Sequence, residues 1–408
     1  MTQHLTDKSW FDQLQAHMVE WRRYLHKNPE ISFQESNTAA FVADKLESWG
    51  IEVRRQVGGH GVVGTIRGVK PGPVVMLRAD MDALPIQDEK DCEYRSDVDG
   101  AMHACGHDGH TSVLLGTAYY FSLNRDELAG EIRLLFQPAE ELLPGGAVNV
   151  IKEGVMEGVD VIYGIHLWTP FPIGTAASCA GPLMAAADDF YIEITGKGGH
   201  GGMPQSTHDS VVAGSALVMQ LQSIVSRSVD PLRPAVLTVG TIQGGFAQNV
   251  IAETCRLSGT VRTFDEETRT VMKERLHAVT ELTAATYGTT SKIRYIMGYP
   301  PVVNDAHEAS RFFKEAGPVV GEGNVKEASK LMPAEDFAYY LERVPGCFMF
   351  VGAGNPTKNA VYPHHHPKFD FDEDAMILAV RLFIAMSSGY AAERNAGTDV
   401  QGLMPNIS

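Results

Sequence analysis

The sequence predicts an α/β protein in which a mainly parallel sheet with helices on both faces is interrupted by an inserted ferredoxin-like domain. Three observations predict this class. The chain has 408 residues, and because single hydrophobic cores stop growing at about 250 to 300 residues, two domains are expected. Short apolar runs alternate with helical stretches in the first and last parts of the chain, as in parallel strands joined by helical crossovers. A block with a different order of elements separates these two parts.

Two helices are expected before the first strands. Apolar residues recur at helical spacing from Trp10 to Leu25, which is the pattern of an amphipathic helix. A second helix is predicted from Glu35 to Trp49, where Gly50 ends it. After this point the pattern changes to that of buried strands.

Four short apolar runs have the pattern of buried strands in one sheet. They lie at residues 74–77, 132–136, 161–165 and 348–351. Polar side chains follow each run, in the order Asp80 and Asp82, Glu140 and Glu141, His166, and the triplet His364, His365 and His366. In open α/β sheets, sites assemble beyond the carboxyl ends of the strands. These side chains are therefore expected at one edge of the sheet.

The block from residue 187 to residue 298 has its own order of predicted elements. They are a strand at 189–195, a helix at 209–227, strands at 235–242 and 254–264, a helix at 266–287 and a strand at 292–297. The order β-α-β-β-α-β is that of the ferredoxin-like split βαβ unit. We therefore predict a discontinuous domain at 1–186 and 299–408 that carries the polar side chains above, and an inserted domain at 187–298.

Composition and charge exclude several classes of partner. The chain has 34 basic and 50 acidic residues, a formal net charge of −16, which repels nucleic acid phosphates and anionic lipids. Its five cysteines lack the spacing of a disulfide framework, which favours a reducing compartment. The segment from Met1 to Lys8 lacks the apolar stretch of a signal peptide, and no run approaches the ~18 apolar residues of a membrane span. The sequence predicts a cytoplasmic protein without nucleic acid or membrane partners.

The segment from Met102 to His110, M-H-A-C-G-H-D-G-H, has the composition of a metal site. Taken singly, a cysteine or histidine here is equally well explained by a buried thiol beside a capping imidazole. The wider cluster favours metal ligation by Cys105, His107, Glu141, His166 and His365. Such a mixture of donors suits zinc, manganese, cobalt or nickel rather than calcium or magnesium. Because a cysteine thiolate can bridge two ions, two divalent metals are favoured over one.

The adjacent carboxylates of Glu140 and Glu141 predict a division of labour. Their side chains diverge in an extended turn, so they do not easily share one ion. One would coordinate a metal, and the other would accept a proton from activated water and pass it to a leaving nitrogen. A solvated acidic turn is the alternative, which the preceding buried strand disfavours. The chemistry that this arrangement indicates is hydrolysis.

Asp80 and Asp82 follow the first apolar run on alternate positions. The functional interpretation is that one of them orients or screens a metal ligand. The alternative is an ion pair between Arg78 and Asp80 that braces the turn. Both interpretations can hold, one for each aspartate.

The inserted block contains a glycine-rich loop, G-K-G-G-H-G-G, at residues 196–202. Such a loop allows the backbone to approach a ligand closely. The order of a phosphate-binding loop, G-x-x-x-x-G-K-[ST], is missing. His200 in this loop, Asn249 in Q-N-V-I and Arg262 in G-T-V-R are ambiguous on spacing alone, because exposed polar residues and surface ion pairs account for them equally well.

Eight motifs occur in order between about His26 and Asp374: R-A-D-M-D-A-L-P, M-H-A-C-G-H-D-G-H, Q-P-A-E-E, G-I-H-L-W, G-K-G-G-H-G-G-M-P, N-V-I, G-T-V-R and H-H-P-K-F-D-F-D. Together they resemble the dinuclear-metal aminoacylase and carboxypeptidase family. The chain is most similar to its amidohydrolase branch, which contains N-acyl-amino-acid amidohydrolases, hippurate hydrolases and auxin-conjugate hydrolases. The C-G-H-D-G-H and P-A-E-E elements are specific to this resemblance.

The resemblance implies roles for the residues of the first domain, which becomes the catalytic domain. The metal ligands would be Cys105 in the bridging position, His107, Glu141, His166 and His365. Glu140 would be the general base, and Asp82 would orient a metal ligand. Among three consecutive histidines, His365 is chosen because the branch places one residue between the ligand and the proline, here His366 before Pro367.

The resemblance also implies roles for the inserted domain as a dimerisation and lid domain. Its His200 would reach into the partner subunit's site and polarise the scissile carbonyl. Asn249 and Arg262 match positions that contact the substrate, with the arginine suited to a terminal carboxylate. A homodimer or a dimer of dimers is therefore expected.

The implied function is a metal-dependent amidohydrolase that cleaves N-acyl amino acids to a carboxylic acid and a free amino acid. The acyl group would be acetyl, benzoyl or longer, and each subunit would bind two divalent ions of manganese, zinc, nickel or cobalt. A dipeptidase or carboxypeptidase with the same dinuclear site is one alternative. A non-catalytic metal-binding module is another, which Glu140 disfavours because metal storage does not require it.

Overall fold

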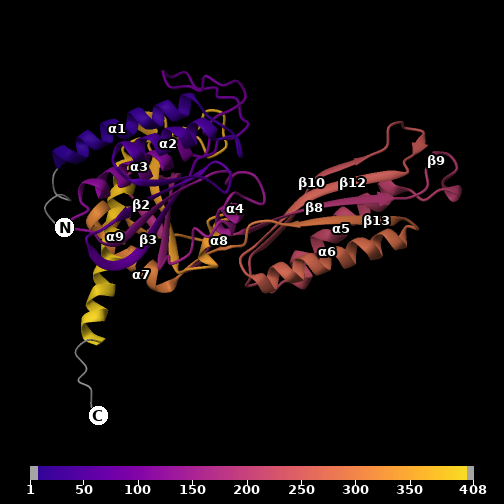
Figure 1. The fold of residues 1–408 in the computed structure, drawn as a ribbon. Helices are drawn as coiled ribbons and strands as arrows, with labels where there is room; N and C mark the ends of the chain where they lie inside the picture. Colours follow the sequence, from indigo (N-terminus) through magenta and orange to yellow (C-terminus); the bar gives the residue numbers. More distant parts are fainter. Residues whose placement is uncertain (1–7, 402–408) are drawn as a thin grey trace, which may run out of the picture. The chain divides into compact units, whose positions relative to one another are not determined.

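The computed structural model describes residues 8–401, with the side chains of residues 8–395, and divides into two compact units (Figure 1). Unit 1 comprises the residues up to 181, residues 303–329 and the residues from 339 onward, and unit 2 comprises residues 182–302 and 330–338. The finer domain boundaries given above stay predictions. Residues 1–7, on which the cytoplasmic prediction partly depends, lie outside the described residues.

Unit 1 is built on an eight-stranded sheet with the order β1-β2-β4-β3-β5-β16-β6-β15. The strands are β1 (Glu52–Val57), β2 (Gly61–Arg67), β4 (Ala129–Gln137), β3 (Lys70–Asp80), β5 (Val161–Pro172), β16 (Gly346–Gly354), β6 (Ala176–Ser178) and β15 (Val325–Glu327). The central strands β4, β3, β5 and β16 are parallel neighbours, whereas β1, β2 and β6 pair antiparallel at the sides. The four predicted apolar runs fall in the four central strands, so the predicted α/β class with a mainly parallel sheet is confirmed.

Unit 1 contains five long helices and two short ones among the described residues. The long ones are α1 (Lys8–Lys27), α2 (Ser36–Ser48), α3 (His107–Leu123), α7 (Ala306–Val320) and α9 (Ala375–Gln401); α4 (Ala147–Lys152) and α8 (Ala338–Leu341) are short. Gly50 follows α2 with φ +67°, a left-handed conformation that glycine adopts without a steric penalty. The carboxylate of Asp305 accepts from the His307 and Glu308 amides and caps α7.

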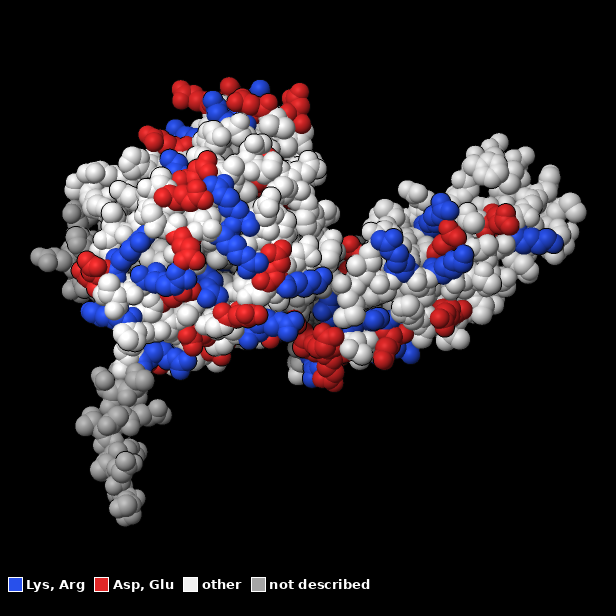
Figure 2. Space-filling view, in the orientation of Figure 1, with Lys and Arg blue, Asp and Glu red and all other residues white. Residues whose placement is uncertain are grey.

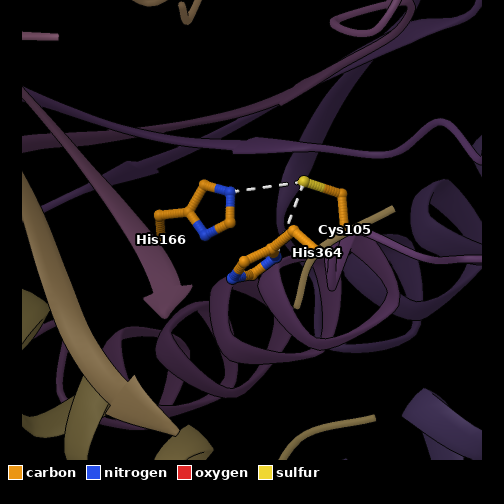
Figure 3. Close-up of side chains that lie close together, drawn as sticks. All are labelled: Cys105, His166 and His364. Carbon is orange, nitrogen blue, oxygen red and sulfur yellow. Dashed lines mark hydrogen bonds between the residues drawn. The ribbon is translucent and has the colours of Figure 1, made fainter. Parts of the chain in front are cut away.

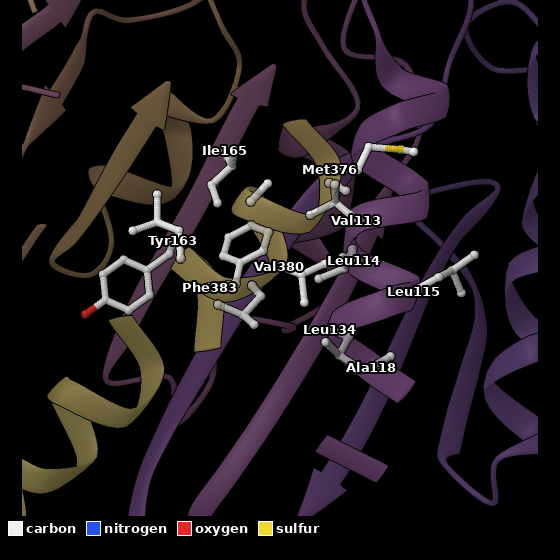
Figure 4. Packing of buried hydrophobic residues seen from close by; sticks show 14 of the residues in the cluster. Val113, Leu114, Leu115, Ala118, Leu134, Tyr163, Ile165, Met376, Val380 and Phe383 are labelled. Atoms are coloured by element: carbon white, nitrogen blue, oxygen red, sulfur yellow. The ribbon is translucent and has the colours of Figure 1, made fainter. Parts of the chain in front are cut away.

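The core of unit 1 lies between the sheet and its helices. Helix α3 packs against α1, α9 and the central strand β3. Figure 4 shows Leu114 of α3, Val380 and Phe383 of α9 and Ile165 of β5 in one apolar cluster. The opposite face of the sheet is also covered, because neighbouring residues of one strand, such as Met76 and Leu77 in β3, point to opposite faces and are both buried.

Helix α9 differs from what the sequence predicted. Its residues Ala375–Asn395 are long and apolar enough to cross a membrane by length and composition alone, so the prediction that no run approaches such a span is wrong. The structure explains this apolarity by burial in the protein core rather than in a membrane. Of the most apolar window, 61% is buried inside the structure, and α9 contacts α1, α3, α7 and three central strands. A helix surrounded on most sides by core is expected to be apolar around most of its circumference.

Unit 2 has a four-stranded antiparallel sheet with the order β10-β12-β8-β13. Its elements are β8 (Ala186–Thr195), α5 (Ser210–Ser228), β10 (Ala235–Gly244), β12 (Thr254–Thr263), α6 (Glu266–Thr286) and β13 (Thr290–Met297). Asp209 and Asp265 cap the two helices, whose apolar faces form one core with the sheet. This order of elements, with β8 between β12 and β13, is that of the predicted ferredoxin-like unit. A two-stranded sheet of β9 (Gly199–His200) and β11 (Val250–Ile251) extends from it.

The charged side chains are distributed over the surface rather than gathered by sign. Figure 2 shows acidic and basic residues interspersed on the visible face of each unit. Many of the exposed basic side chains are paired, for example Arg55 with Asp44 and Glu47 and Arg256 with Glu193. Such a face offers no continuous basic track for a phosphate backbone.

Candidate metal centre

The register of the central strands sets the level of the candidate site in unit 1. Asp80, the last residue of β3, pairs with Gln137, the last residue of β4. In the next strand Gly164 pairs with Arg78, so His166 of β5 lies level with the ends of β3 and β4. Glu140 and Glu141 follow β4 directly. The polar residues that follow these strands therefore meet at one edge of the sheet.

Cys105 and His107 approach this edge from the N-terminus of helix α3. The helix begins at His107, and Gly106 immediately before it has φ +96°. This left-handed turn allows Cys105 and His107, two residues apart, to face the same volume. Cys105, His107 and Glu141 each place one donor atom within 4.8 Å of the other two.

Cys105 also faces two imidazoles (Figure 3). Its Sγ lies 3.5 Å from His166 Nε2 and 3.9 Å from His364 Nδ1. His166 Nδ1 lies 2.9 Å from the backbone oxygen of Leu167, so Nδ1 carries the ring proton and donates it there. The lone pair of His166 Nε2 is left facing Cys105, which is the tautomer that a metal ligand requires.

His107 is oriented in the same way. Its Nδ1 lies 3.3 Å from Asp82 Oδ1, so the ring donates to the carboxylate and directs Nε2 into the site. Within the part of the chain that the structure describes, His107 Nε2 and Glu141 Oε1 are buried and make no hydrogen bond. These two atoms lie 3.9 Å apart.

His365 completes the predicted set from the loop after β16. Its Nε2 lies 3.3 Å from Glu141 Oε1, and its backbone has φ +66°. The His365 amide donates to the backbone oxygen of Ala104 at 2.8 Å, which fixes the loop beside the Cys105 segment. The close contact with the Glu141 carboxylate raises the pKa of His365. The structure thus brings together all five residues predicted to bind metal, and their ligand roles stay predictions.

His364 is a neighbour of Cys105 that the sequence did not single out. The Thr169 amide donates to His364 Nε2 at 3.4 Å, which places the ring proton on Nδ1, the atom that faces the sulfur. The ring stacks on Trp168 with centroids 4.4 Å apart, so its orientation is fixed. In this tautomer His364 Nδ1 donates toward the sulfur of Cys105. The only sequence signal was the run of three imidazoles, which does not rank its members.

Asp80 and Asp82 make different contacts, which correspond to the two interpretations given for them from the sequence. Asp80 accepts from Arg78 Nη1 at 2.7 Å and lies 2.6 Å from His110 Nδ1. His110 Nε2 accepts from the Leu167 amide at 2.9 Å, so His110 links Asp80 to the strand that carries His166. Asp82 contacts His107 instead. His110 was not among the predicted site residues, although its helical spacing of three from His107 was an available signal.

The electrostatics of the site favour a bound cation. Burial and the carboxylates of Glu141 and Glu140 raise the pKa of the Cys105 thiol well above its usual range. Burial opposes a charge on His107, but Asp80, Asp82 and Glu141 raise its pKa to about 10. Protons therefore occupy both donors when no other cation is near. The residues present fit a metal site, because His107 Nε2, which makes no hydrogen bond within the described residues, a Glu141 carboxylate oxygen and the Cys105 thiol converge in a volume rich in negative charge.

Glu140 lies at the same turn and is only 6% exposed. Its amide donates to Asp82 Oδ1 at 3.0 Å, and the Glu141 amide donates to Asp82 Oδ2 at 3.0 Å. One carboxylate therefore holds the backbone of both glutamates. The division of labour between Glu140 and Glu141 stays a prediction.

The three predicted residues of unit 2 do not lie together within that unit. His200 of β9 pairs with Val250, so Asn249 is its near neighbour, and both side chains are exposed. Arg262 pairs with Ala187, whereas Thr254 at the other end of β12 pairs with Thr195. At about 3.4 Å per residue, Arg262 lies roughly 27 Å along the strand from the end nearer His200. Burial lowers the pKa of Arg262, and its Nη1 donates to the Val261 oxygen at 3.1 Å.

Comparison with known proteins places this geometry in a family. The model of peptidase family M20/M25/M40 matches residues 76–388. The chain is 48% identical over 298 residues to an N-acyl-L-amino acid amidohydrolase of Geobacillus stearothermophilus, covering 73% of this chain and 80% of that protein. It is 43% identical over 366 residues to the N-acetyl-L-cysteine deacetylase of Bacillus subtilis, covering 90% and 86%.

A solved structure agrees with the sequence matches. The YXEP protein of Bacillus subtilis, described as a dinuclear metal binding peptidase from the M20 family, superimposes with a TM-score of 0.80 at 36% identity. The match covers 92% of this chain and 98% of that one. The relatives are named as hydrolases, so a metal-binding module without catalysis is set aside. The chain belongs to peptidase family M20/M25/M40, and it is a hydrolase of amide bonds.

Proposed function

We propose that this hydrolase cleaves N-acyl amino acids to a carboxylic acid and a free amino acid. The observation that carries the proposal is the convergence of thiol, imidazole and carboxylate donors beside a second carboxylate, Glu140. Two relatives named for N-acyl amino acid substrates support the substrate class.

The metal-binding residues would be Cys105, His107, Glu141, His166 and His365. When bound, two divalent cations of manganese, zinc, nickel or cobalt would polarise the amide carbonyl and lower the pKa of a water molecule. Cys105 would hold metal as a thiolate, and the proton on His364 Nδ1 would stabilise that charge. Asp82 would hold His107 in the tautomer that directs Nε2 inward.

Glu140 would perform the proton transfers. It takes a proton from the attacking water as the water oxygen bonds to the amide carbon. It then delivers the proton to the amide nitrogen as the carbon–nitrogen bond breaks. The acyl group leaves as a carboxylic acid and the nitrogen leaves as the amine of the amino acid.

The residues of unit 2 would recognise the substrate. We propose that Arg262 binds the terminal carboxylate, that Asn249 contacts the substrate and that His200 acts in the site of the partner subunit on the scissile carbonyl. Unit 2 would accordingly serve as a dimerisation and lid domain inserted at 187–298. The exposure of His200 and Asn249 and their place on the small β9–β11 sheet are consistent with groups that act outside their own unit.

A substrate panel tests this proposal. Protein stripped of metal is reloaded separately with Mn²⁺, Zn²⁺, Ni²⁺ or Co²⁺, and amine release is measured for N-acetyl, N-benzoyl and long-chain N-acyl amino acids and for dipeptides. We expect at least one N-acyl class to be hydrolysed faster than every dipeptide, and no turnover before metal is restored.

A peptidase acting on dipeptides or at carboxyl termini is the second candidate. The description of the YXEP protein as a peptidase favours it. Faster turnover of dipeptides than of every N-acyl amino acid would establish this candidate in place of the first.

A further inference from the structure

Glu35 has a buried carboxyl group. Capping of helix α2, at whose start it lies, does not explain why this group is buried. Glu35 stands at the N-cap of α2, but its side chain makes no capping hydrogen bond. Glu30 caps this helix instead, accepting from the Thr38 amide at 2.7 Å and the Asn37 amide at 3.1 Å. The side chain of Glu35 is fully buried. Burying a carboxyl group is costly unless it has partners, so its contacts indicate its role.

The partners of Glu35 are two backbone amides, one of them next to the candidate general base. Oε1 accepts from the Phe33 amide at 2.9 Å and from the Ala139 amide at 2.8 Å. Ala139 has φ +55°, a left-handed conformation that costs free energy for any residue with a Cβ. The hydrogen bond from the Ala139 amide to Glu35 therefore stabilises an unfavourable backbone conformation, together with the bond that the Ala139 oxygen accepts from the Gly146 amide.

Two carboxyl groups together hold three consecutive amides. The Ala139 amide donates to Glu35, and the amides of Glu140 and Glu141 donate to Asp82. The loop that carries Glu35 also supports Asp82, because Ser32 Oγ donates to Asp82 Oδ2 at 2.6 Å. Each amide of residues 139–141 therefore has a carboxylate acceptor that fixes its direction. The direction of this backbone decides where the two glutamate side chains lie.

We propose that Glu35 is a positioning residue, which fixes the Ala139 peptide and thereby sets the directions in which Glu140 and Glu141 leave the turn. The consequence for catalysis rests on the proposed function of these glutamates. The hydrogen bonds of the Glu35 side chain are with backbone amides rather than with the predicted ligands. Glu35 acts through the backbone of Ala139.

The raised pKa and the hydrogen bonding of Glu35 suggest a matched pair of variants. Burial and the charge of Asp82 raise the pKa of Glu35 to about 7, and its Oε2 is buried without a hydrogen-bond partner among the residues that the structure describes. A glutamine is nearly isosteric with the neutral acid and keeps the carbonyl oxygen that accepts from Ala139. A leucine keeps the approximate volume but removes the acceptor, which leaves the buried Ala139 amide unsatisfied.

The experiment compares Glu35→Gln, Glu35→Leu and Glu30→Ala with the wild-type protein. Steady-state kinetics on the best substrate of the panel give kcat and KM, and titration with Mn²⁺ gives metal affinity. Hydrogen exchange followed by mass spectrometry reports on the peptide that spans residues 137–142 without requiring turnover. Glu30→Ala is the control for a loss of stability in the same loop, because the Glu30 side chain accepts from the Asn37 and Thr38 amides of α2 rather than from the amides of residues 139–141.

We expect Glu35→Gln to keep kcat within about threefold and to keep slow exchange at 139–141. Glu35→Leu should lose about 10- to 100-fold in kcat with KM changed less than threefold, since small displacements of a reacting group have effects of this size. It should also exchange faster at 139–141 and bind Mn²⁺ more weakly, because Glu141 shares the turn. Glu30→Ala should lower the melting temperature and leave kcat unchanged.

Two outcomes overturn the proposal: wild-type kcat and exchange in Glu35→Leu, or an equal loss in Glu35→Gln. If Glu35→Leu does not fold, the comparison of Glu35→Gln with Glu35→Asp decides, because aspartate keeps the acid but is too short to reach Ala139. If wild-type protein hydrolyses nothing in the panel, the proposed function fails on its own. The exchange and Mn²⁺ measurements then still decide whether Glu35 holds the turn.

Discussion

Asp82 accepts hydrogen bonds from four groups and so fixes both a predicted ligand and the predicted base. The donors are His107 Nδ1, Ser32 Oγ and the amides of Glu140 and Glu141. Burial alone would raise the pKa of Asp82, but the bonds from His107 and Ser32 hold it below the usual value. Asp82 therefore stays ionised and needs no metal contact to act on the site. Its position is that of a group that orients ligands.

Substitution of the base separates catalysis from metal binding. Glu140→Gln keeps the volume and the turn but removes the proton acceptor. We expect it to keep the wild-type metal content and to lose about 10²- to 10⁴-fold in kcat, with elemental analysis and amine release as the two measurements. A variant with substantial remaining turnover would remove Glu140 from the role of base.

Removal of the Cys105 thiol should instead lower the metal content. Cys105→Ala deletes a donor that faces both His166 and the His107–Glu141 pair. We expect reconstituted Cys105→Ala to hold less metal than the wild type by elemental analysis. The matched control is Cys92→Ala, which removes a partly buried thiol outside the candidate site. Equal metal contents in the two variants would contradict ligation by Cys105.

At the scale of elements, helix α1 is joined to α3 through a buried network of charges. Arg22 Nε donates to Asp108 Oδ2 at 2.8 Å, and His26 Nδ1 lies 2.7 Å from the same oxygen. Asp108 follows His107 directly in α3, so the network anchors the helix that presents a predicted ligand. On its other side His26 Nε2 lies 3.3 Å from Asp88 Oδ2. Buried pairs of this kind are costly to break because each partner is left without compensation.

This network predicts acid sensitivity of unit 1. Burial opposes ionisation of Asp88, but hydrogen bonds from His26 and the Ser96 amide lower its pKa to about 2, below the unfolded value of about 3.9. The unfolded state therefore binds the proton more tightly, so the stabilisation is complete above about pH 4 and is lost as the pH falls toward 2. Thermal melts between pH 5 and 2 measure this. Asp88→Asn should show a smaller change over the same interval, and an unchanged pH dependence would contradict the assignment.

At the scale of the whole molecule, the chain forms two units with separate cores. All predicted metal ligands lie in unit 1, and all predicted substrate contacts outside the metal site lie in unit 2. Within unit 2, His200 and Arg262 lie toward opposite ends of the sheet. One unit 2 is therefore poorly suited to present both residues to one site. This arrangement supports the proposal that His200 acts in the site of the partner subunit.

A dimer in solution follows from that proposal. Sedimentation of the purified protein should give a mass of about twice the 44.4 kDa of one chain, or a larger even multiple. His200→Ala should lower turnover while leaving that mass and the metal content unchanged. A protein that is fully active as a monomer would exclude a catalytic role for His200 from a partner subunit.

The sequence by itself determined the class of fold and the chemical types in the site. Apolar runs of strand length fix β3, β4, β5 and β16, because only residues buried on both faces read as continuous apolar runs. The β-α-β-β-α-β order of unit 2 was equally plain from periodicity. The donor types were also evident, since a cysteine, imidazoles and carboxylates that follow such strands are together typical of a metal site.

Only the tertiary structure decided which atoms face which. The family pattern chose His365 from the three histidines, but it did not show that His364 also faces the site: one ring is directed to Cys105 and the other to Glu141. The sequence also did not reveal that Glu35, about a hundred positions from Ala139, holds the turn before Glu140. The physical reason is that hydrogen bonds between distant segments depend on how strands and helices pack. Local periodicity reports which face of an element is buried, and it carries no information on the partner across the core.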